Sequence, residues 1–220
     1  MTHDGNREEE AFQESGRKLF AGPVEFRHAA ETVAALPVES VPEIAFAGRS
    51  NVGKSSLVNA LTGRNALARI SRTPGRTRQL NFFDVNGRLT LVDMPGYGFA
   101  AAPKQQVSAW TSLIRAYLGG RATLARVYLL IDARHGFKPV DEEILTLMDR
   151  AAVSYQVILT KTDALDRSAL SAVLARTERF IAKRPAAFPR VIPTSARSGA
   201  GIADLRGSIA RLLAERSVPL

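Results

Sequence analysis

The chain of 220 residues is 45% apolar and 23% charged, which is the balance of a soluble globular domain. It contains no cysteine, which excludes disulfide bonds and thiolate metal sites and fits a reducing compartment. No apolar run approaches the roughly 20 residues that span a bilayer. The polar N-terminus also lacks the apolar core of a secretory signal, so we expect a cytoplasmic protein without a membrane partner.

Basic side chains outnumber acidic ones, and the net charge is +9. The first 22 residues hold three basic and five acidic side chains, so residues 23–220 hold 27 basic against 16 acidic, a net charge of +11. Such an excess favours a polyanionic partner, and nucleic acid is the obvious one. A basic, arginine-rich proteome would give the same balance, so charge alone leaves the partner open.

Apolar patterning divides the chain into two parts. Residues 1–22 show no apolar periodicity and are predicted to form a disordered acidic tail. From Glu43 onward, short apolar runs alternate with amphipathic stretches, which predicts parallel βαβ units in one α/β domain over residues 23–220. The pair Asn86-Gly87 predicts a hairpin between antiparallel neighbours. The six predicted strands are Glu43–Ala47, Gln79–Val85, Leu89–Asp93, Val127–Asp132, Tyr155–Thr160 and Arg190–Pro193.

Three amphipathic stripes predict helices that cover this sheet. Because of its helical spacing, Trp110 is predicted to be a core residue rather than part of a ligand site. The stripes are Val107, Trp110, Ile114, Tyr117 and Leu118; then Leu170, Val173, Leu174, Thr177 and Ile181; and last Ile202, Leu205, Ile209, Leu212 and Leu213.

The segment Gly48-Arg-Ser-Asn-Val-Gly-Lys-Ser55 matches the phosphate-loop pattern G-x-x-x-x-G-K-S/T and lies between a predicted strand and a predicted helix. Gly48 and Gly53 allow the backbone to turn tightly, so that consecutive N–H groups converge on phosphate oxygens. The helix that begins near Lys54 adds the positive end of its dipole. We expect Lys54 to reach the β- and γ-phosphates and Ser55 to ligate Mg²⁺. The motif alone does not distinguish ATP from GTP.

A second phosphate-binding segment, Asp93-Met-Pro-Gly96, ends an apolar strand 39 residues after Lys54. An aspartate there can hold Mg²⁺ through water, and the Gly96 N–H can bond the γ-phosphate. Loss of that phosphate would release the segment, which predicts an order–disorder switch. Tyr97 stands where Ras-like switches carry a glutamine that orients water. This predicts slow intrinsic hydrolysis, or a catalytic group supplied from elsewhere.

Another switch is expected in Ser71–Gln79, where Pro74-Gly75 marks a turn and the arginines argue against a core position. A nucleotide switch needs a threonine there that completes Mg²⁺ coordination and senses the γ-phosphate. Thr73 and Thr77 both qualify, and we prefer Thr77 because it closely precedes the strand beside the nucleotide. Asn51, in the phosphate loop, either recruits potassium that aids catalysis or stabilises the turn, and the sequence favours neither role.

Guanine recognition is predicted from Thr160-Lys-Thr-Asp163, which follows a strand and fits the pattern N/T-K-x-D. Guanine presents N1–H and an amino group side by side, and the Asp163 carboxylate can accept from both. Adenine offers an acceptor instead, so such a site discriminates by roughly 10⁴-fold or more. The Lys161 stem can cover the base, and Thr160, in place of the commoner Asn, should tie this loop to the phosphate loop differently. Thr194-Ser-Ala196 resembles the loop whose backbone N–H reads guanine O6.

With these residues placed, the chain resembles the EngB (YihA/YsxC) family of bacterial GTPases, within the Era/TrmE-like group. The resemblance runs from about Val24 to Leu213 and leaves out the tail. The family-like segments are Pro74-Gly-Arg-Thr77, Leu80-Asn-Phe-Phe83, Asp93-Met-Pro-Gly-Tyr-Gly-Phe99, Trp110, Tyr117 and Asp132-Ala-Arg-His135. Within the last segment, His135 is expected to make a structural or partner contact rather than to act as an acid or base.

The resemblance implies a Ras-like phosphate-loop GTPase fold, with a six-stranded, mostly parallel sheet flanked by helices on both faces. It implies a monomer that binds GTP or GDP with Mg²⁺, with potassium as a candidate cofactor. The implied partner is the large ribosomal subunit or its precursor, with its rRNA and proteins, and the implied role is in subunit assembly, normal cell division and septation.

Site residues follow from the motifs and the resemblance together. The metal ligands are expected to be Ser55 and Thr77, and the catalytic residues Lys54, Thr77 and Asn51. Arg78 departs from the glutamine that the family often has. The expected nucleotide-binding residues are Gly48, Arg49, Ser50, Asn51, Val52, Gly53, Lys54, Ser55, Gly75, Arg76, Thr77, Arg78, Gln79, Asp93, Met94, Pro95, Gly96, Thr160, Lys161, Thr162, Asp163, Thr194, Ser195 and Ala196.

Two other functional classes are weighed against this one. A phosphate-loop kinase would transfer phosphate to a small acceptor, but kinases lack the Thr160–Asp163 motif, which therefore argues against that class. A nucleotide-dependent scaffold with negligible catalysis is compatible with Tyr97 in place of glutamine.

Overall fold

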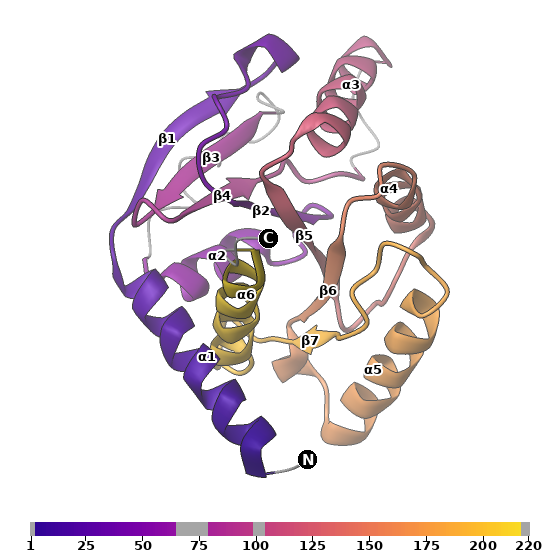
Figure 1. Ribbon diagram of the computed structural model, residues 1–220. Helices are drawn as coiled ribbons and strands as arrows, with labels where there is room; N and C mark the ends of the chain where they lie inside the picture. The colour runs from indigo at the N-terminus through magenta and orange to yellow at the C-terminus, as the bar shows by residue number, and fades with distance from the viewer. Residues whose placement is uncertain (1–2, 65–78, 99–103, 217–220) are drawn as a thin grey trace.

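The computed structural model describes residues 3–64, 79–98 and 104–216, with side chains described over 5–64, 79–98 and 111–216. A seven-stranded sheet in the order β1-β3-β4-β2-β5-β6-β7 forms its centre, with helices on both faces (Figure 1). The strands are β1 Val24–Ala30, β2 Glu43–Gly48, β3 Leu80–Val85, β4 Leu89–Asp93, β5 Leu124–Asp132, β6 Tyr155–Thr160 and β7 Ile192–Pro193. The helices are α1 His3–Ala21, η1 Val33–Ala35, α2 Lys54–Thr62, α3 Lys104–Gly120, α4 Pro139–Arg150, η3 Thr162–Ala164, α5 Arg167–Ile181 and α6 Ile202–Arg216.

The predicted α/β class is confirmed, and each of the six predicted strands is present. Strands β4, β2, β5, β6 and β7 run parallel, and the predicted Asn86-Gly87 hairpin joins β3 and β4 as antiparallel neighbours. The predicted number of strands was one too few, because β1 adds an antiparallel edge beside β3. Most of its residues are exposed or half-buried, and its register shifts between Phe26 and His28, so it lacks the buried alternation that marks a strand.

The core lies on both faces of the sheet. One apolar cluster packs beneath α3, α4 and α5, and the other beneath α1, α2 and α6. All nine residues of β5 are buried, as expected for a central parallel strand that is covered on both faces. The predicted stripes face this core through Ile114 and Tyr117 of α3, Ile181 of α5 and Leu205 of α6. Trp110 lies outside the residues whose side chains the structure describes.

The N-terminal segment corrects a prediction. Residues 1–22 were expected to be disordered, but His3–Ala21 forms helix α1, which packs along α6 (Figure 1). Leu19 and Phe20 at its end are buried against the core. The helix is polar on average, so its sequence alone indicates little burial. Its order comes from a partner helix near the other end of the chain.

Glycine allows α1 and α6 to approach closely. A Cβ atom added at Gly16 would lie 2.3 Å from the Arg206 carbonyl oxygen, and one added at Gly207 would lie 3.2 Å from Gln13. The Gln13 side chain also donates to Asp204 at 2.7 Å, and the Arg211 guanidinium lies 4.7 Å from the Phe12 ring centroid. The helices are therefore held by close backbone packing with a few polar ties around it. None of the described helices combines the length and apolar character needed to cross a bilayer.

This packing predicts the effect of adding one methyl group. Gly16→Ala should lower the free energy of unfolding by about 1–3 kcal/mol, because the new Cβ forces α1 away from α6. Urea unfolding followed by circular dichroism measures this difference. Gly119→Ala in α3 is the matched control, since a Cβ there meets nothing within 4 Å, and it should leave stability unchanged or raise it slightly. Equal stabilities of the two variants would contradict the close α1–α6 packing.

Candidate functional site

The carboxyl ends of the parallel strands bring the predicted motifs to one edge of the sheet. β2 ends at Gly48, β4 at Asp93, β5 at Asp132 and β6 at Thr160, and neighbouring strands in this group are hydrogen-bonded to one another. In open α/β sheets, ligands bind in the crevice outside this edge. The phosphate loop, the Asp93 turn and the Thr160–Asp163 loop are therefore neighbours in space, although more than 100 residues separate the first from the last.

The phosphate loop has the backbone that anion binding requires. Asn51 has a φ of 63° and Gly53 a φ of 104°, so the chain passes through left-handed conformations before α2 begins at Lys54. The first amides of a helix have no partner within that helix, and its dipole is positive there. The start of α2 therefore has the backbone arrangement that can hold a phosphate.

The Asp93–Gly96 turn lies directly against the phosphate loop. The Lys54 ammonium pairs with the Asp93 carboxylate, and both side chains are largely buried. At Gly96 an added Cβ would lie 2.8 Å from Ser50 Oγ and 3.2 Å from the Ser50 backbone. Only glycine fits there without displacing the phosphate loop. The structure thus brings together the two segments predicted to share the phosphates.

Tyr97 continues this contact and then turns into the core. Its N–H donates to the Gly48 carbonyl at 3.3 Å, and its own carbonyl accepts from the Ser50 N–H at 3.2 Å. Its hydroxyl donates to Asp141 Oδ1 at 2.8 Å, and Arg49 Nε lies 3.5 Å from the same oxygen. Burial, and then the negative charge of Asp141, raises the pKa of Tyr97 far above its ordinary value. Tyr97 therefore anchors the turn to α4.

The Thr160–Asp163 loop is bonded to the phosphate loop from the opposite side. Thr160 Oγ1 donates to the Val52 carbonyl at 2.6 Å, and Lys161 Nζ donates to the Asn51 carbonyl at 2.6 Å. Thr160 thus ties the two loops together through its hydroxyl. Lys161 has a φ of 59° and passes beside Gly53, with its Cε 3.5 Å from a Cβ placed there. The lysine stem accordingly lies between the predicted base and phosphate regions.

Asp163 lies exposed at the end of this loop, with Ser195 as its partner. Ser195 Oγ donates to Asp163 Oδ1 at 2.6 Å, and the Thr162 N–H donates to the Thr194 carbonyl at 3.2 Å. The hydrogen bond from Ser195 holds the pKa of Asp163 below its ordinary value. The segments Thr160–Asp163 and Thr194–Ala196, predicted from separate patterns, are thus joined, and the carboxylate stays ionised.

Asp132 is a neighbour of the site that the sequence analysis did not include among the site residues. Its Oδ2 lies 2.9 Å from Lys161 Nζ, and Arg134 binds both of its oxygens at 2.8–2.9 Å. Burial raises the pKa of Asp132, but the hydrogen bonds from Arg134 and Lys161 outweigh it and hold the pKa well below its ordinary value. Its signal in the sequence was an acid that directly follows the apolar run from Val127 to Ile131. His135 is exposed, and its N–H donates to the Asp132 carbonyl.

The expected switch threonine lies outside the described residues. The same is true of Thr73, Gly75, Arg76 and Arg78, so the assignment of Thr77 stays a prediction. Gln79 is described, and its Nε2 donates to Asn81 Oδ1 at 2.8 Å at the start of β3.

The fold and this site define a phosphate-loop GTPase. A family model described as "50S ribosome-binding GTPase" matches residues 43–161, which span the phosphate loop, the Asp93 turn and the first two residues of the Thr160–Asp163 loop. This match covers more than half of the chain. Relatives that are 62% and 55% identical to the chain over 93% and 99% of its length narrow the class further, and the chain belongs to their family, the EngB family of GTP-binding proteins.

Two relatives are similar over almost their whole length. The chain is 62% identical over 206 residues to a probable GTP-binding protein EngB of Bradyrhizobium diazoefficiens, covering 93% of this chain and 95% of the relative. It is 55% identical over 224 residues to the protein of the same description in Afipia carboxidovorans, and this match covers 99% of this chain and 100% of the relative.

Solved structures agree with the fold. A crystal structure of a probable GTP-binding protein EngB superposes with a TM-score of 0.58 at 26% identity, covering 79% of this chain and 99% of that one. A variant of Era of Aquifex aeolicus, bound to GDP and aluminium fluoride, also superposes with a TM-score of 0.58, at 21% identity. This match covers 79% of this chain and 57% of Era. The second likeness bears on the fold alone.

The buried Tyr97–Asp141 bond predicts a cost for losing one hydroxyl. Tyr97→Phe should lower the free energy of unfolding by about 2 kcal/mol, because it removes a donor from a buried carboxylate. Tyr128→Phe is the matched control: that hydroxyl is buried and has no hydrogen-bond partner among the described residues, so its removal should cost little. Chemical denaturation of both variants measures the difference. A Tyr97→Phe protein as stable as the wild type would contradict the anchoring role.

Proposed function

We propose that the protein is a cytoplasmic, Mg²⁺-dependent GTPase switch that acts on the large ribosomal subunit or its precursor and hydrolyses GTP slowly by itself. One observation carries the nucleotide part of this proposal. Three segments with different tasks meet at one sheet edge and are bonded to each other, through Lys54–Asp93 and Thr160–Val52. Such a set of side chains can bind the phosphates and the base of one nucleotide together with its metal ion.

Guanine is the base that the exposed carboxylate suits. Ser195 donates to Asp163 and lowers the pKa of this exposed carboxylate, and the ionised group can accept from the N1–H and the amino group of guanine. The acceptor of adenine would leave the carboxylate unpaired once the bound base covers it, and a covered acceptor without a donor is costly. The backbone of Thr194–Ala196 lies beside it through the Thr162–Thr194 bond, in keeping with a contact to O6. The same arrangement disfavours a phosphate-loop kinase.

The donor set at the phosphate end fits Mg²⁺. Ser55 supplies a hydroxyl at the start of α2, and the Asp93 carboxylate lies against Lys54 of the same turn. Magnesium prefers such oxygen ligands and retains several waters. Ser55 and Thr77 would hold the ion, with Asp93 acting through water. The bound ion would neutralise charge on the β- and γ-phosphates.

The remaining steps, binding of the phosphates and orientation of water, depend on groups of the protein itself. The amides of Gly48–Ser55 and the Lys54 ammonium bind and orient the phosphates, and the Gly96 N–H contacts the terminal one. Hydrolysis also needs a group that orients water, and Tyr97 cannot supply it because its hydroxyl is bonded to Asp141 in the core. This supports a low intrinsic rate. The left-handed backbone of Asn51 supports a turn-forming role for it, while potassium recruitment stays a proposal.

Two observations support a ribosomal partner. The family model carries the description "50S ribosome-binding GTPase", and residues 23–220 bear a net charge of +11, which suits an RNA-rich particle. We propose subunit assembly as the role, with disturbed division and septation as the consequence of losing it. The competing function is a nucleotide-dependent scaffold without significant catalysis, which the buried Tyr97 side chain also suits.

Ionisation of Asp163 makes guanine-nucleotide affinity depend on pH, and the hydrogen bond from Ser195 shifts that dependence. Ser195→Ala should weaken GDP binding about tenfold at neutral pH, because the carboxylate loses the donor that orients it. The bond lowers the pKa of Asp163, so its loss raises that pKa and protonates the carboxylate sooner as the pH falls. The acid limb of the affinity profile should therefore move to higher pH. Fluorescent GDP titrations from pH 4 to 8 measure both effects.

Ser168→Ala, at an exposed position in the first turn of α5, is the control for this experiment. It should leave both the affinity and the acid limb where they are in the wild type. If Ser195→Ala had the wild-type affinity and the wild-type acid limb, the Ser195 hydrogen bond would not orient a carboxylate that binds the base.

Measurement of GTP hydrolysis with purified large-subunit particles tests the proposed function as a whole. We expect slow hydrolysis by the protein alone and a rate at least tenfold higher with the particles. Omission of Mg²⁺ should abolish both rates. Parallel assays in potassium and sodium buffers decide the role of Asn51. Nucleotide-dependent binding to particles without any rise in hydrolysis would establish the scaffold instead, and no binding to particles would reject a ribosomal function.

A further inference from the structure

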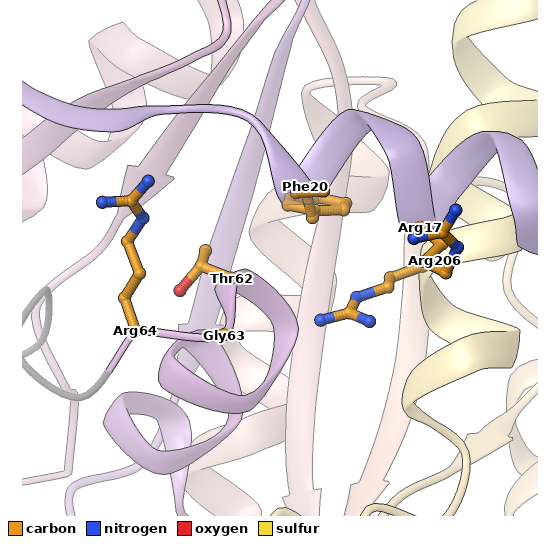
Figure 2. Close-up of a pocket in the computed structure, with 7 residues that line it drawn as sticks. Arg17, Phe20, Thr62, Gly63, Arg64 and Arg206 are labelled. Atoms are coloured by element: carbon orange, nitrogen blue, oxygen red, sulfur yellow. The ribbon is translucent and has the colours of Figure 1, made fainter.

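A second concave site lies at the opposite end of α2 from the phosphate loop. A pocket of about 410 Å³ opens between the end of α1, the end of α2 and the side of α6 (Figure 2). Helix α2 has nine residues, so this pocket is about 13 Å from the phosphate loop along the helix axis. Its lining includes Arg17, Phe20, Thr62, Gly63, Arg64 and Arg206.

Arg206 is the most buried cation of this pocket. It extends from α6 toward the end of α2 (Figure 2), where Nε donates to the Leu61 carbonyl at 2.8 Å and Nη2 to the Ala60 carbonyl at 3.2 Å. These bonds fix the guanidinium plane. Within the described part of the chain, no carboxylate pairs with Arg206 and its third nitrogen, Nη1, has no acceptor. Burial, and then the positive charge of Arg17, lowers the pKa of Arg206.

The other two guanidinium groups lie at the rim. Arg64 Nη2 donates to the Gly22 carbonyl at 3.3 Å, and no carboxylate pairs with Arg64 over the described ranges. Arg17 pairs with Glu14 at 2.7 Å, and its side chain is 60% exposed. Arg17 of α1, Arg206 of α6 and Arg64, just after α2, therefore share this pocket. Only Arg17 has an acidic partner among the described residues. Partly buried cations without a counter-charge are unfavourable unless an anion joins them.

We propose that this pocket binds a phosphate group of an RNA backbone. The planar, multiple donors of arginine match phosphate oxygens better than a single ammonium would, and phosphate contacts position a protein on RNA without reading its sequence. The Arg206 plane is already fixed, so it can bind an oxygen with little loss of conformational entropy. The exposed Arg17 and Arg64 suit a long chain that passes over the surface. The choice of RNA as the source of the phosphate rests on the proposed ribosomal function.

RNA affinity of matched charge variants tests this site. The double variant Arg17→Gln/Arg64→Gln removes two exposed guanidinium groups from the pocket and keeps the Arg206 bonds that hold α2. Arg115→Gln/Arg150→Gln removes two exposed arginines elsewhere and gives the same net charge. Each full-length protein, loaded with GDP, is titrated into a short fluorescein-labelled RNA hairpin, and anisotropy is recorded over a series of salt concentrations.

The pocket variant should bind the hairpin at least about tenfold more weakly than the control variant. Its plot of log affinity against log salt should be shallower by about one unit for each phosphate that it no longer binds. Arg206→Lys keeps the charge but loses the planar donors, so it should also weaken binding. Equal affinities of the two double variants would overturn the proposal, because the basic surface would then act without a defined site.

Two additional arms separate the alternatives. If millimolar inorganic phosphate binds the wild type but not the pocket variant, while both double variants bind the hairpin equally, the ligand is free phosphate and RNA is the wrong source. Sedimentation with large-subunit particles separates this inference from the proposed function. Particle binding that the pocket variant retains in full would reject the pocket and leave the ribosomal function standing. Pocket-dependent hairpin binding without any particle binding would reject the ribosomal function and leave the pocket standing as an RNA site.

Discussion

The nucleotide site depends on the parallel pairing of β2 with β4, which sets Phe46 beside Asp93. The pairing continues past both strands: the Met94 N–H donates to the Phe46 carbonyl, and Tyr97 and Gly48 are joined in the same way. The phosphate loop and the Asp93 turn are therefore one continuous backbone unit. A slip of one residue would turn the Asp93 side chain to the other face of the sheet, away from Lys54.

A second set of bonds joins the base region to the same unit. Thr160 and Lys161 donate to the carbonyls of Val52 and Asn51, so two side chains of one loop fix the backbone of the other. Asp132 holds the lysine from the side of β5. Because these bonds involve main-chain carbonyls of the phosphate loop, its amides remain directed at the ligand. The distance between the base-binding and phosphate-binding regions is thus set by protein contacts, before a nucleotide contributes.

The sequence predicted the elements whose stability is local or whose burial is complete. Strands Leu89–Asp93 and Tyr155–Thr160 were predicted to the residue, because apolar runs buried on both faces leave a clear pattern. Helix α1 was missed because its order comes from Gly16 packing against Arg206, 190 residues away. The partner of Tyr97 was unpredictable for the same reason, since Asp141 is 44 residues distant and buried in α4. Local periodicity carries no information about such contacts.

Tyr97, directly after Gly96, shows how a predicted switch segment can also be part of the core. The Asp141 carboxylate is fully buried and is held by the Tyr97 hydroxyl and the Lys138 N–H. Any movement that separates Tyr97 from it removes a donor from a buried charge, which costs far more than the same loss at the surface. A rearrangement of the Asp93–Gly96 turn must therefore either leave Tyr97 in place or carry α4 with it. Tyr97 thereby links the Asp93–Gly96 turn to helix α4.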